Sequence, residues 1–222
     1  STHSFTLFPY TTLFRSVDVI VGPGNKFVQG AKKVVFGQVG IDFIAGPTEV
    51  MIIADETANP AWVAADLLAQ AEHDVVAQPI LVTDSEDYAH KVSAEIEAQL
   101  ETLTTKATAR VSIDDCGKII LVDKLEDAIE VANRKAPEHL ELAMDDGKLR
   151  DKIEKNVFNY GSLFIGHYAA EVYGDYAAGL NHTLPTSGSA KFTRGLSVRM
   201  FLKTVTTLRV KEGKVGTVKS GA

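Results

Sequence analysis

Residues 50–83 read VMIIADETANPAWVAADLLAQAEHDVVAQPILVT. The two apolar runs at 50–54 and 78–83 are typical of buried strands. Between them, Asn59 and Pro60 mark a helix start, because Asn caps helices and Pro is tolerated at the first helical position. The stretch therefore predicts a strand, a helix and a second strand. The positions that we expect this helix to turn inward are Trp62, Ala65, Leu68 and Ala69.

The same alternation continues on both sides of this unit. Further strands are predicted at 17–21, 40–45, 118–122, 139–143 and 162–166, and further helices at 26–36, 84–105, 124–135 and 147–156. Strands that alternate with helices indicate an α/β fold with a mainly parallel sheet and helices on both faces.

Composition narrows the class of protein. The chain has 222 residues, is 45% hydrophobic and carries a net charge of −6, so it can bury a sizeable core. It has no long Lys/Arg cluster, which argues against a nucleic-acid partner. No apolar run reaches the roughly 18 residues that a membrane-spanning helix needs. Cys116 is the single cysteine, which fits a reducing, cytoplasmic location.

The two ends differ from the rest of the chain. Residues 1–16 are rich in Ser, Thr and aromatic residues without acidic side chains or the features of a signal peptide, and we interpret them as a non-native, poorly ordered leader. After Val210 the chain becomes rich in Lys, Gly and Ser. Both ends suggest a piece of a longer protein.

Gln70 and His73 close the helix of the opening stretch. A spacing of three residues puts both side chains on one helix face. An amide oxygen and an imidazole nitrogen aimed together can hold a divalent metal such as zinc. Taken alone, the pair is more typical of a partly exposed surface pair.

Two further groups are candidates for the same chemistry. Glu138 and His139 place a carboxylate beside an imidazole, the usual general base at neutral pH, and both reach one site if Glu138 is still in the turn before the strand. Asp175 lies in a Gly-flanked loop and is able to complete a metal shell or to bond only to nearby backbone. These residues fall at strand or helix ends, where open α/β sheets bind ligands.

Two Gly-Pro turns complete the set of motifs. The turn at 22–25 precedes a predicted helix, where free N–H groups attract phosphate, but it lacks the full dinucleotide fingerprint and Pro23 removes a donor. The turn at 46–49 has the same form. Each turn alone is a weak signal.

Taken together, five motifs resemble the histidinol dehydrogenase family in their order and gaps. They are GPGN at 22–25, AGPTE at 45–49, LAQAEH at 68–73, APEHL at 136–140, and the stretch from GDY at 174–176 to NHTLPT at 181–186. The resemblance implies an incomplete Rossmann-like parallel-sheet domain. It divides the chain into the tail of a cofactor-binding domain (17–47), a substrate and zinc domain (48–196) and the start of a C-terminal segment (197–222).

The resemblance also implies a role for each matching residue. The family oxidises L-histidinol to L-histidine through the aldehyde, with two NAD⁺ and one zinc ion, as a homodimer. By this likeness Gln70, His73 and Asp175 are zinc ligands that also contact substrate. His139 is the general base, Glu138 activates water, Thr48 contacts substrate and Asn25 contacts NAD. A further zinc-binding His and a substrate-binding Glu of the family lie in a segment beyond the match.

Three other functions remain open from the sequence. Relatives of this fold oxidise other small alcohols such as sulfonated diols, and Leu180 stands where the family commonly has Pro or Thr. A non-catalytic fragment that binds zinc is the second alternative. The third is a zinc hydrolase, since three N/O ligands plus water is the usual hydrolytic arrangement. The hydrolase reading leaves Asn25 and its Gly-rich turn without a role.

Overall fold

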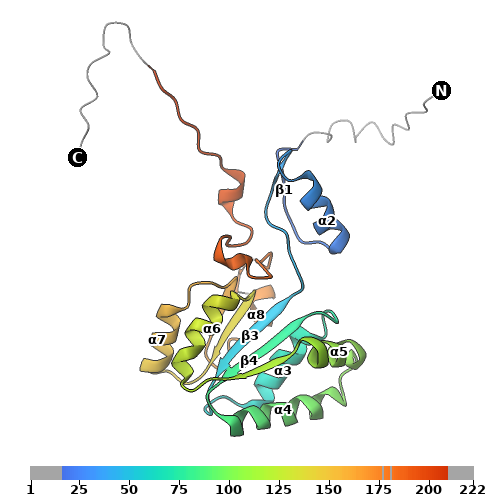
Figure 1. Cartoon of the computed structure of the whole chain (residues 1–222), viewed down its shortest axis with the longest axis vertical. Coiled ribbons are helices and arrows are strands. Elements are labelled where there is room, and N and C mark those ends of the chain that lie inside the picture. Colours follow the sequence, from blue (N-terminus) through green and yellow to red (C-terminus); the bar gives the residue numbers. More distant parts are fainter. Residues whose placement is uncertain (1–16, 177, 181, 210–222) are drawn as a thin grey trace, which may run out of the picture.

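The computed structural model describes residues 17–176, 178–180 and 182–209, with only the backbone of Asp175 and Tyr176 (Figure 1). The leader predicted at 1–16 and the segment after residue 209 lie outside this range. In the part of the chain that is described, no helix is both long and apolar enough to cross a membrane.

A five-stranded parallel sheet forms the centre of the molecule. Its strands are β3 (Glu49–Ala54), β4 (Gln78–Thr83), β5 (Lys118–Leu121), β6 (His139–Ala143) and β7 (Ser162–Ile165), in the spatial order β5-β4-β3-β6-β7. All neighbouring pairs are parallel, which confirms the predicted α/β class. The order reverses its direction between β3 and β6, the arrangement of doubly wound sheets.

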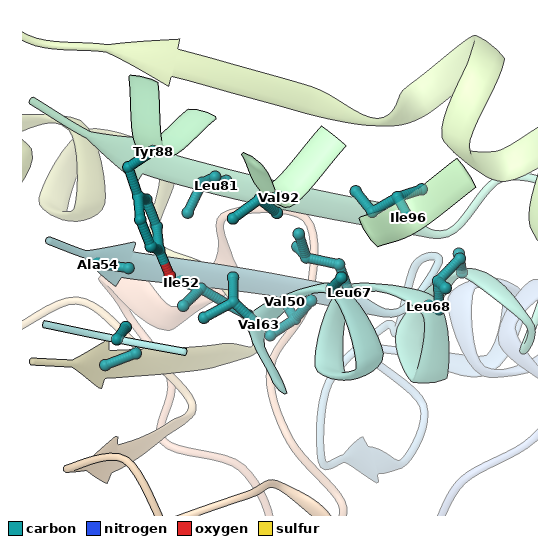
Figure 2. Close-up of a cluster of buried hydrophobic side chains, with 14 of the residues drawn as sticks. Val50, Ile52, Ala54, Val63, Leu67, Leu68, Leu81, Tyr88, Val92 and Ile96 are labelled. Atoms are coloured by element: carbon teal, nitrogen blue, oxygen red, sulfur yellow. The ribbon is translucent and has the colours of Figure 1, made fainter. Parts of the chain in front are cut away.

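Helices cover both faces of this sheet. On one face lie α3 (Pro60–Ala71), α4 (Glu86–Leu100) and α5 (Lys106–Cys116), which enclose the apolar cluster of Figure 2 with alternate residues of β3. On the other face lie α6 (Ala128–Lys135), after a 3-10 turn at Leu125–Asp127, and α7 (Lys148–Asn156). Because successive strand residues point to opposite faces, β3 supplies Val50 and Ile52 to one cluster and Met51 and Ile53 to the other.

The inward face predicted for α3 is wrong in part. Leu68 is buried, but Trp62 is 47% exposed, and Ala65 and Ala69 are also exposed. The residues that pack on the sheet are Val63, Ala64, Leu67, Leu68 and Ala71. They follow the helical period better, and the small side chains at 65 and 69 gave little signal about which face they occupy.

The long helix predicted at 84–105 is also shorter than expected. α4 begins after the Ser85 cap, whose hydroxyl accepts from the Tyr88 amide, and ends at Leu100. A separate helix, α5, begins at Lys106 and was not expected from the sequence. The apolar face expected for α4 is correct: Val92, Ile96 and Leu100 are buried.

A smaller unit precedes the sheet. β1 (Val19–Ile20), α2 (Lys26–Val35) and β2 (Gly40–Ile41) form a two-stranded parallel sheet with one helix, and Figure 1 shows it apart from the main sheet. Buried Lys32 ties the helix to the strand end through a 2.7 Å ion pair with Asp42. The domain boundaries at residues 47 and 196 stay predictions.

The remaining elements are short and follow β7. They are α8 (Val172–Tyr176) and two 3-10 turns, Ser189–Lys191 and Val198–Phe201. Asp175 therefore stands in a helix of five residues, where the sequence predicted a loop.

Candidate active site

Glu138 and His139 lie at the amino end of β6, after the turn that follows α6. Ala136 ends the helix in the left-handed conformation with φ of 54°, and the strand begins at His139. Glu138 is therefore still in the turn, and its Oε2 lies 3.9 Å from Nδ1 of His139. The side chains of Glu138 and His139 therefore reach the same site, as expected if Glu138 lies in the turn.

The His139 ring is buried and its two nitrogens have different surroundings. The residue is 1% exposed, and Nδ1 lies 3.1 Å from the Glu49 carbonyl oxygen. A carbonyl only accepts, so Nδ1 carries the proton and Nε2 keeps a lone pair. Nε2 has no hydrogen-bond partner among the described residues and lies 3.4 Å from Oε1 of Glu171. Burial lowers the pKa of His139 to about 3, which keeps the imidazole neutral.

The Glu138 carboxylate is held by two donors. Its Oε2 accepts from the Thr48 hydroxyl at 2.7 Å and from the Glu49 amide at 3.1 Å. Burial raises the pKa of Glu138 to about 7, the two hydrogen bonds oppose this, and the nearby Glu49 charge adds to it. The group is therefore able to gain and lose a proton near neutral pH.

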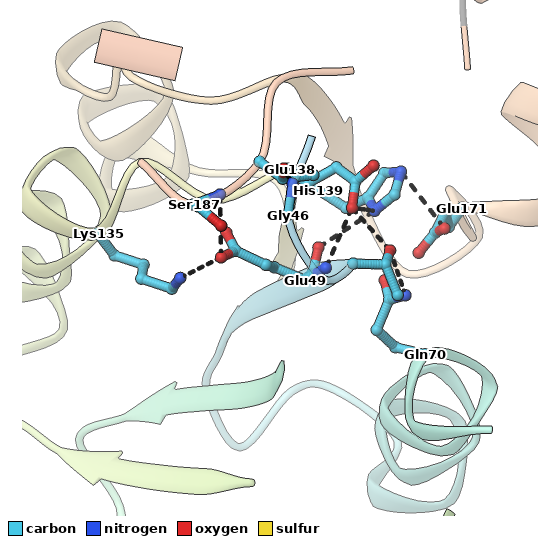
Figure 3. A network of polar contacts seen from close by, with 10 residues as sticks. Gly46, Glu49, Gln70, Lys135, Glu138, His139, Glu171 and Ser187 are labelled. Carbon is cyan, nitrogen blue, oxygen red and sulfur yellow. Dashed lines mark hydrogen bonds and ion pairs between the residues drawn. The ribbon is translucent and has the colours of Figure 1, made fainter. Parts of the chain in front are cut away.

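Gln70 joins this pair from the end of α3 (Figure 3). Its Nε2 donates to the Thr48 hydroxyl at 2.7 Å, and that hydroxyl donates to Glu138. Gln70 is 1% exposed, and its Oε1 has no hydrogen-bond partner among the described residues. A buried amide oxygen without a partner is costly unless a ligand or ion completes it.

The other two predicted metal ligands are placed less completely. His73 lies past the last residue of α3, in a turn where its amide donates to the Gln70 carbonyl, so the one-face helix argument does not hold for it. Its ring is exposed, yet its charge contributes to lowering the pKa of His139. For Asp175, the structure describes the backbone but not the side chain. Within the described residues, no three His, Cys, Asp or Glu side chains gather as a metal site.

A cavity of about 100 Å³ brings four of the sequence motifs together. It is lined by the turn at 22–24, the turn at 45–48, Glu138 and the stretch at 182–186. The His182 ring stacks on His139 with 5.8 Å between centroids. Residues more than 150 positions apart therefore share one pocket.

Asn25 has a structural task in this arrangement. Its Oδ1 accepts from the amides of Phe27 and Val28 and so caps α2. Capping holds the neighbouring turn at 22–24, which lines the cavity. The predicted contact to NAD stays a prediction.

The site occupies the amino edge of the sheet. Glu49 and His139 are the first residues of β3 and β6, the pair at which the strand order reverses. Doubly wound sheets usually bind ligands at the carboxyl ends of the strands. At that opposite edge lies His167, which pairs with Asp145 at 2.9 Å and is not part of this site.

Three residues around the site were not predicted from the sequence: Glu49, Lys135 and Glu171. Glu49 is entirely buried, and its Oε1 pairs with Lys135 at 2.7 Å. Glu171 faces His139. An acidic residue at the head of the apolar run 50–54 was an available signal for Glu49, because buried charges are paired. No local signal identifies its partner 86 positions away.

The chain is similar in sequence to known proteins. The family described as histidinol dehydrogenase matches residues 7–221. The histidinol dehydrogenase of Brucella abortus (strain 2308) is 52% identical over 200 residues, which are 90% of this chain and 46% of that protein. The histidinol dehydrogenase of Agrobacterium fabrum is 53% identical over 200 residues, which are again 90% of this chain and 46% of that protein. The chain therefore spans about half the length of these relatives.

Solved structures show the same likeness. The crystal structure of histidinol dehydrogenase from Elizabethkingia anophelis has a TM-score of 0.80 and 41% identity, over 86% of this chain and 43% of that one. An acetylating aldehyde dehydrogenase from Geobacillus thermoglucosidasius shares only the fold, at a TM-score of 0.52, 15% identity and coverage of 88% and 58%. The chain belongs to the histidinol dehydrogenase family.

Proposed function

We propose that this chain carries the substrate and zinc site of an NAD-dependent enzyme that oxidises L-histidinol to L-histidine through the aldehyde. The observation that carries the proposal is the pairing at the amino edge of β6. A neutral imidazole with a lone pair at Nε2 lies beside a carboxyl group that titrates near pH 7. Two successive oxidations need a base for the alcohol proton and a group that activates water.

His139 is the base in this proposal. The Glu49 carbonyl holds the proton on Nδ1, so Nε2 is the atom that accepts the carbinol proton. Burial keeps the ring neutral before the substrate arrives. Stacking on His182 and the contact with Phe164, 6.1 Å between centroids, fix the orientation of the ring.

Glu138 serves the second oxidation. Its pKa of about 7 allows the carboxylate to take a proton from water, which then adds to the aldehyde. The Thr48 hydroxyl and the Glu49 amide hold Oε2 in place, and both bonds favour the charged carboxylate. Thr48 is also the proposed substrate contact, since its hydroxyl lines the cavity.

Gln70 and His73 fit a zinc ion. The Gln70 Oε1 is a buried acceptor that lacks a partner in the described structure, and imidazole is a common zinc ligand. Asp175 is the proposed third protein ligand. Bound zinc would hold the substrate's imidazole and amine, and bound NAD⁺ would accept the hydride. Asn25 orients the turn that we propose for NAD, and the homodimer and the cytoplasmic location remain predictions.

A chimera tests this function directly. The matching 200 residues of the Brucella abortus protein are replaced by those of this chain, and NADH formation from L-histidinol is measured. We expect turnover that falls at least a hundredfold in His139→Asn and stays unchanged in His90→Asn, a matched change on exposed α4.

The choice of substrate in the same assay separates the alternatives. NADH formation with a sulfonated diol but not with L-histidinol would replace the proposed substrate. Ester or amide hydrolysis without NAD⁺, lost in His139→Asn, would replace the oxidoreductase by a hydrolase. A folded chimera without any of these activities would refute the proposal.

A further inference from the structure

Glu49 is the most deeply buried charged residue beside the site. It is 0% exposed and is the first residue of β3. Its Oε1 forms an ion pair with Lys135 at 2.7 Å and accepts from the Ser187 amide at 3.2 Å (Figure 3). The Glu49 carboxylate therefore joins two places to β3: the end of α6, at Lys135, and the chain at Ser187.

The backbone of Glu49 contacts the two reacting side chains. Its amide donates to Oε2 of Glu138 at 3.1 Å, and its carbonyl accepts from Nδ1 of His139 at 3.1 Å. One residue thus holds both groups through its main chain while its side chain is anchored elsewhere. Any shift of Glu49 moves both hydrogen bonds.

The chain between Lys135 and Glu138 is short and bent. Lys135 is the last residue of α6, and Ala136 follows it with the left-handed φ of 54°. Three residues after Lys135 comes Glu138, whose place depends on how this turn is fixed. A non-glycine residue persists in this conformation only where surrounding contacts hold it. The Glu49–Lys135 ion pair is such a contact, because it joins the helix end to β3.

We propose that Glu49 is a positioning residue: through Lys135 it fixes the turn 135–138, while the Ser187 amide holds its carboxylate, so that Glu138 and His139 face the same reacting group. This rests on the proposed function for the roles of Glu138 and His139, but the ion pair and its effect on Glu138 do not depend on turnover. Neither Glu49 nor Lys135 contacts substrate in this proposal.

The positioning role can be distinguished from a purely structural one by the pKa of Glu138. The Glu49 charge raises the pKa of Glu138, so its removal lowers that pKa. The other groups around Glu138 are His139 from β6, neutral Gln70 and Thr48, and His182 across the cavity. Lys135 offsets the Glu49 charge from the α6 side.

The test is a carboxyl titration of the purified chain by ¹³C NMR, with the glutamate side chains labelled and Glu138 assigned through Glu138→Gln. Glu49→Gln removes the charge and keeps the shape. Glu154→Gln on α7 is the matched control, because Glu154 is exposed on a helix remote from the site. We expect the midpoint of Glu138 to fall in Glu49→Gln and to stay at the parent value in Glu154→Gln.

A Glu138 midpoint that is the same in both variants, in a folded chain, overturns the proposal. If Glu49→Gln does not fold, Lys135→Arg and Lys135→Met decide the question. Arg keeps the ion pair and should leave the titration of Glu138 as in the parent, whereas Met should change it. A Met variant that titrates like the parent overturns the proposal as well. Loss of turnover in the chimera would concern the proposed function and not this positioning role.

Discussion

The two edges of the parallel sheet differ in how they treat polar groups. At the amino edge Glu49, Gln70, Glu138 and His139 are all buried. The backbone of Glu49 bonds to both Glu138 and His139, and the Thr48 hydroxyl joins Gln70 to Glu138. At the carboxyl edge, beyond β3 and β4, an open groove is lined by Asp55, Glu56, Asp84, Glu86 and Asp87. The carboxylate hydrogen bonds in this groove are exposed, such as the bond from the Ser85 hydroxyl to Glu56 at 2.7 Å.

This difference shows that strand topology alone does not locate a site. The point where the strand order reverses, between β3 and β6, has both an amino and a carboxyl edge. At the amino edge the candidate catalytic residues combine desolvation, shifted pKa values and, at Gln70, a buried acceptor without a partner in the described residues. Those three features together indicate chemistry, since burying them without function is unfavourable.

Breaking a buried ion pair should produce the largest effect. Lys135→Met at the amino edge leaves the Glu49 carboxylate buried without its cation, and we expect a loss of about 3–5 kcal/mol in the free energy of unfolding. Asp145→Asn, which breaks the exposed pair with His167 at the carboxyl edge, should cost about 1 kcal/mol or less. Urea unfolding at pH 7 measures both. Equal losses would contradict the difference between the edges.

Adding a methyl group should give the next effect. A Cβ at Gly161, at the amino end of β7, would lie 2.5 Å from the Glu138 carbonyl oxygen, which belongs to the rigid backbone. Gly161→Ala should therefore destabilise the chain by about 1–3 kcal/mol. Gly147→Ala beyond the carboxyl end of β6 meets open space and should stay within about 0.5 kcal/mol. Thermal unfolding of the two variants decides this, and a tolerated Gly161→Ala would show that the amino edge is less rigid than described.

The pH dependence of stability tests the buried acidic pair Asp66 and Glu141, which lies between the two edges. Burial raises the pKa of Asp66 to about 6, and burial with the charges of Asp66 and Glu171 raises that of Glu141. Both groups and His167 line one small cavity, and the described part of its lining has no Lys or Arg. A raised folded-state pKa means that stability is full below the unfolded value near 4 and declines as the pH rises through the folded value.

Glu141→Gln removes that decline for one carboxyl group. The stability of the variant relative to the parent should rise between pH 5 and pH 8, as measured by urea unfolding at both values. His139, whose pKa is lowered, makes the opposite contribution to the pH dependence of stability. This contribution is the same in variant and parent, so it cancels when their stabilities are subtracted. A difference that does not vary with pH would refute ionisation of Glu141 in this range.

The smallest expected effect is a gain in stability. Ala136 has a φ of 54°, which glycine adopts without the steric penalty of a Cβ. Ala136→Gly should stabilise the chain by about 0.5–1 kcal/mol, in a thermal melt at pH 7. A loss would mean that the methyl group of this buried residue packs usefully against its neighbours.

The sequence predicted the strands β4 and β6 to the residue. β4 is mostly an apolar run, whereas polar and apolar residues alternate along most of β6. The sequence did not indicate α5, since Lys106–Cys116 has only scattered apolar positions and buries little beyond Ala109 and Ser112. It also joined the chain from 84 to 105 into one helix, since Glu101–Thr105 has no Gly or Pro to mark the break.

The sequence identified candidate residues of the site, but not the contacts that join them. Glu138 and His139 stand next to each other in the sequence, so their meeting follows from the turn. The hydrogen bonds from Gln70 to Thr48 and from Thr48 to Glu138 join residues 22 and 90 positions apart, and such pairs come from tertiary packing. The burial that shifts the pKa values of Glu138 and His139 has the same origin.

The role of His139 as the base is tested most directly by titrating its ring with ¹⁵N NMR in the histidine-labelled chain, with the signal assigned through His139→Asn. We expect a neutral ring with the proton on Nδ1 from pH 8 down to about pH 4, because burial lowers the pKa of His139 to about 3 and the Glu49 carbonyl accepts from Nδ1. A ring that is protonated at pH 6, or that carries its proton on Nε2, would contradict the assignment of Nε2 as the base.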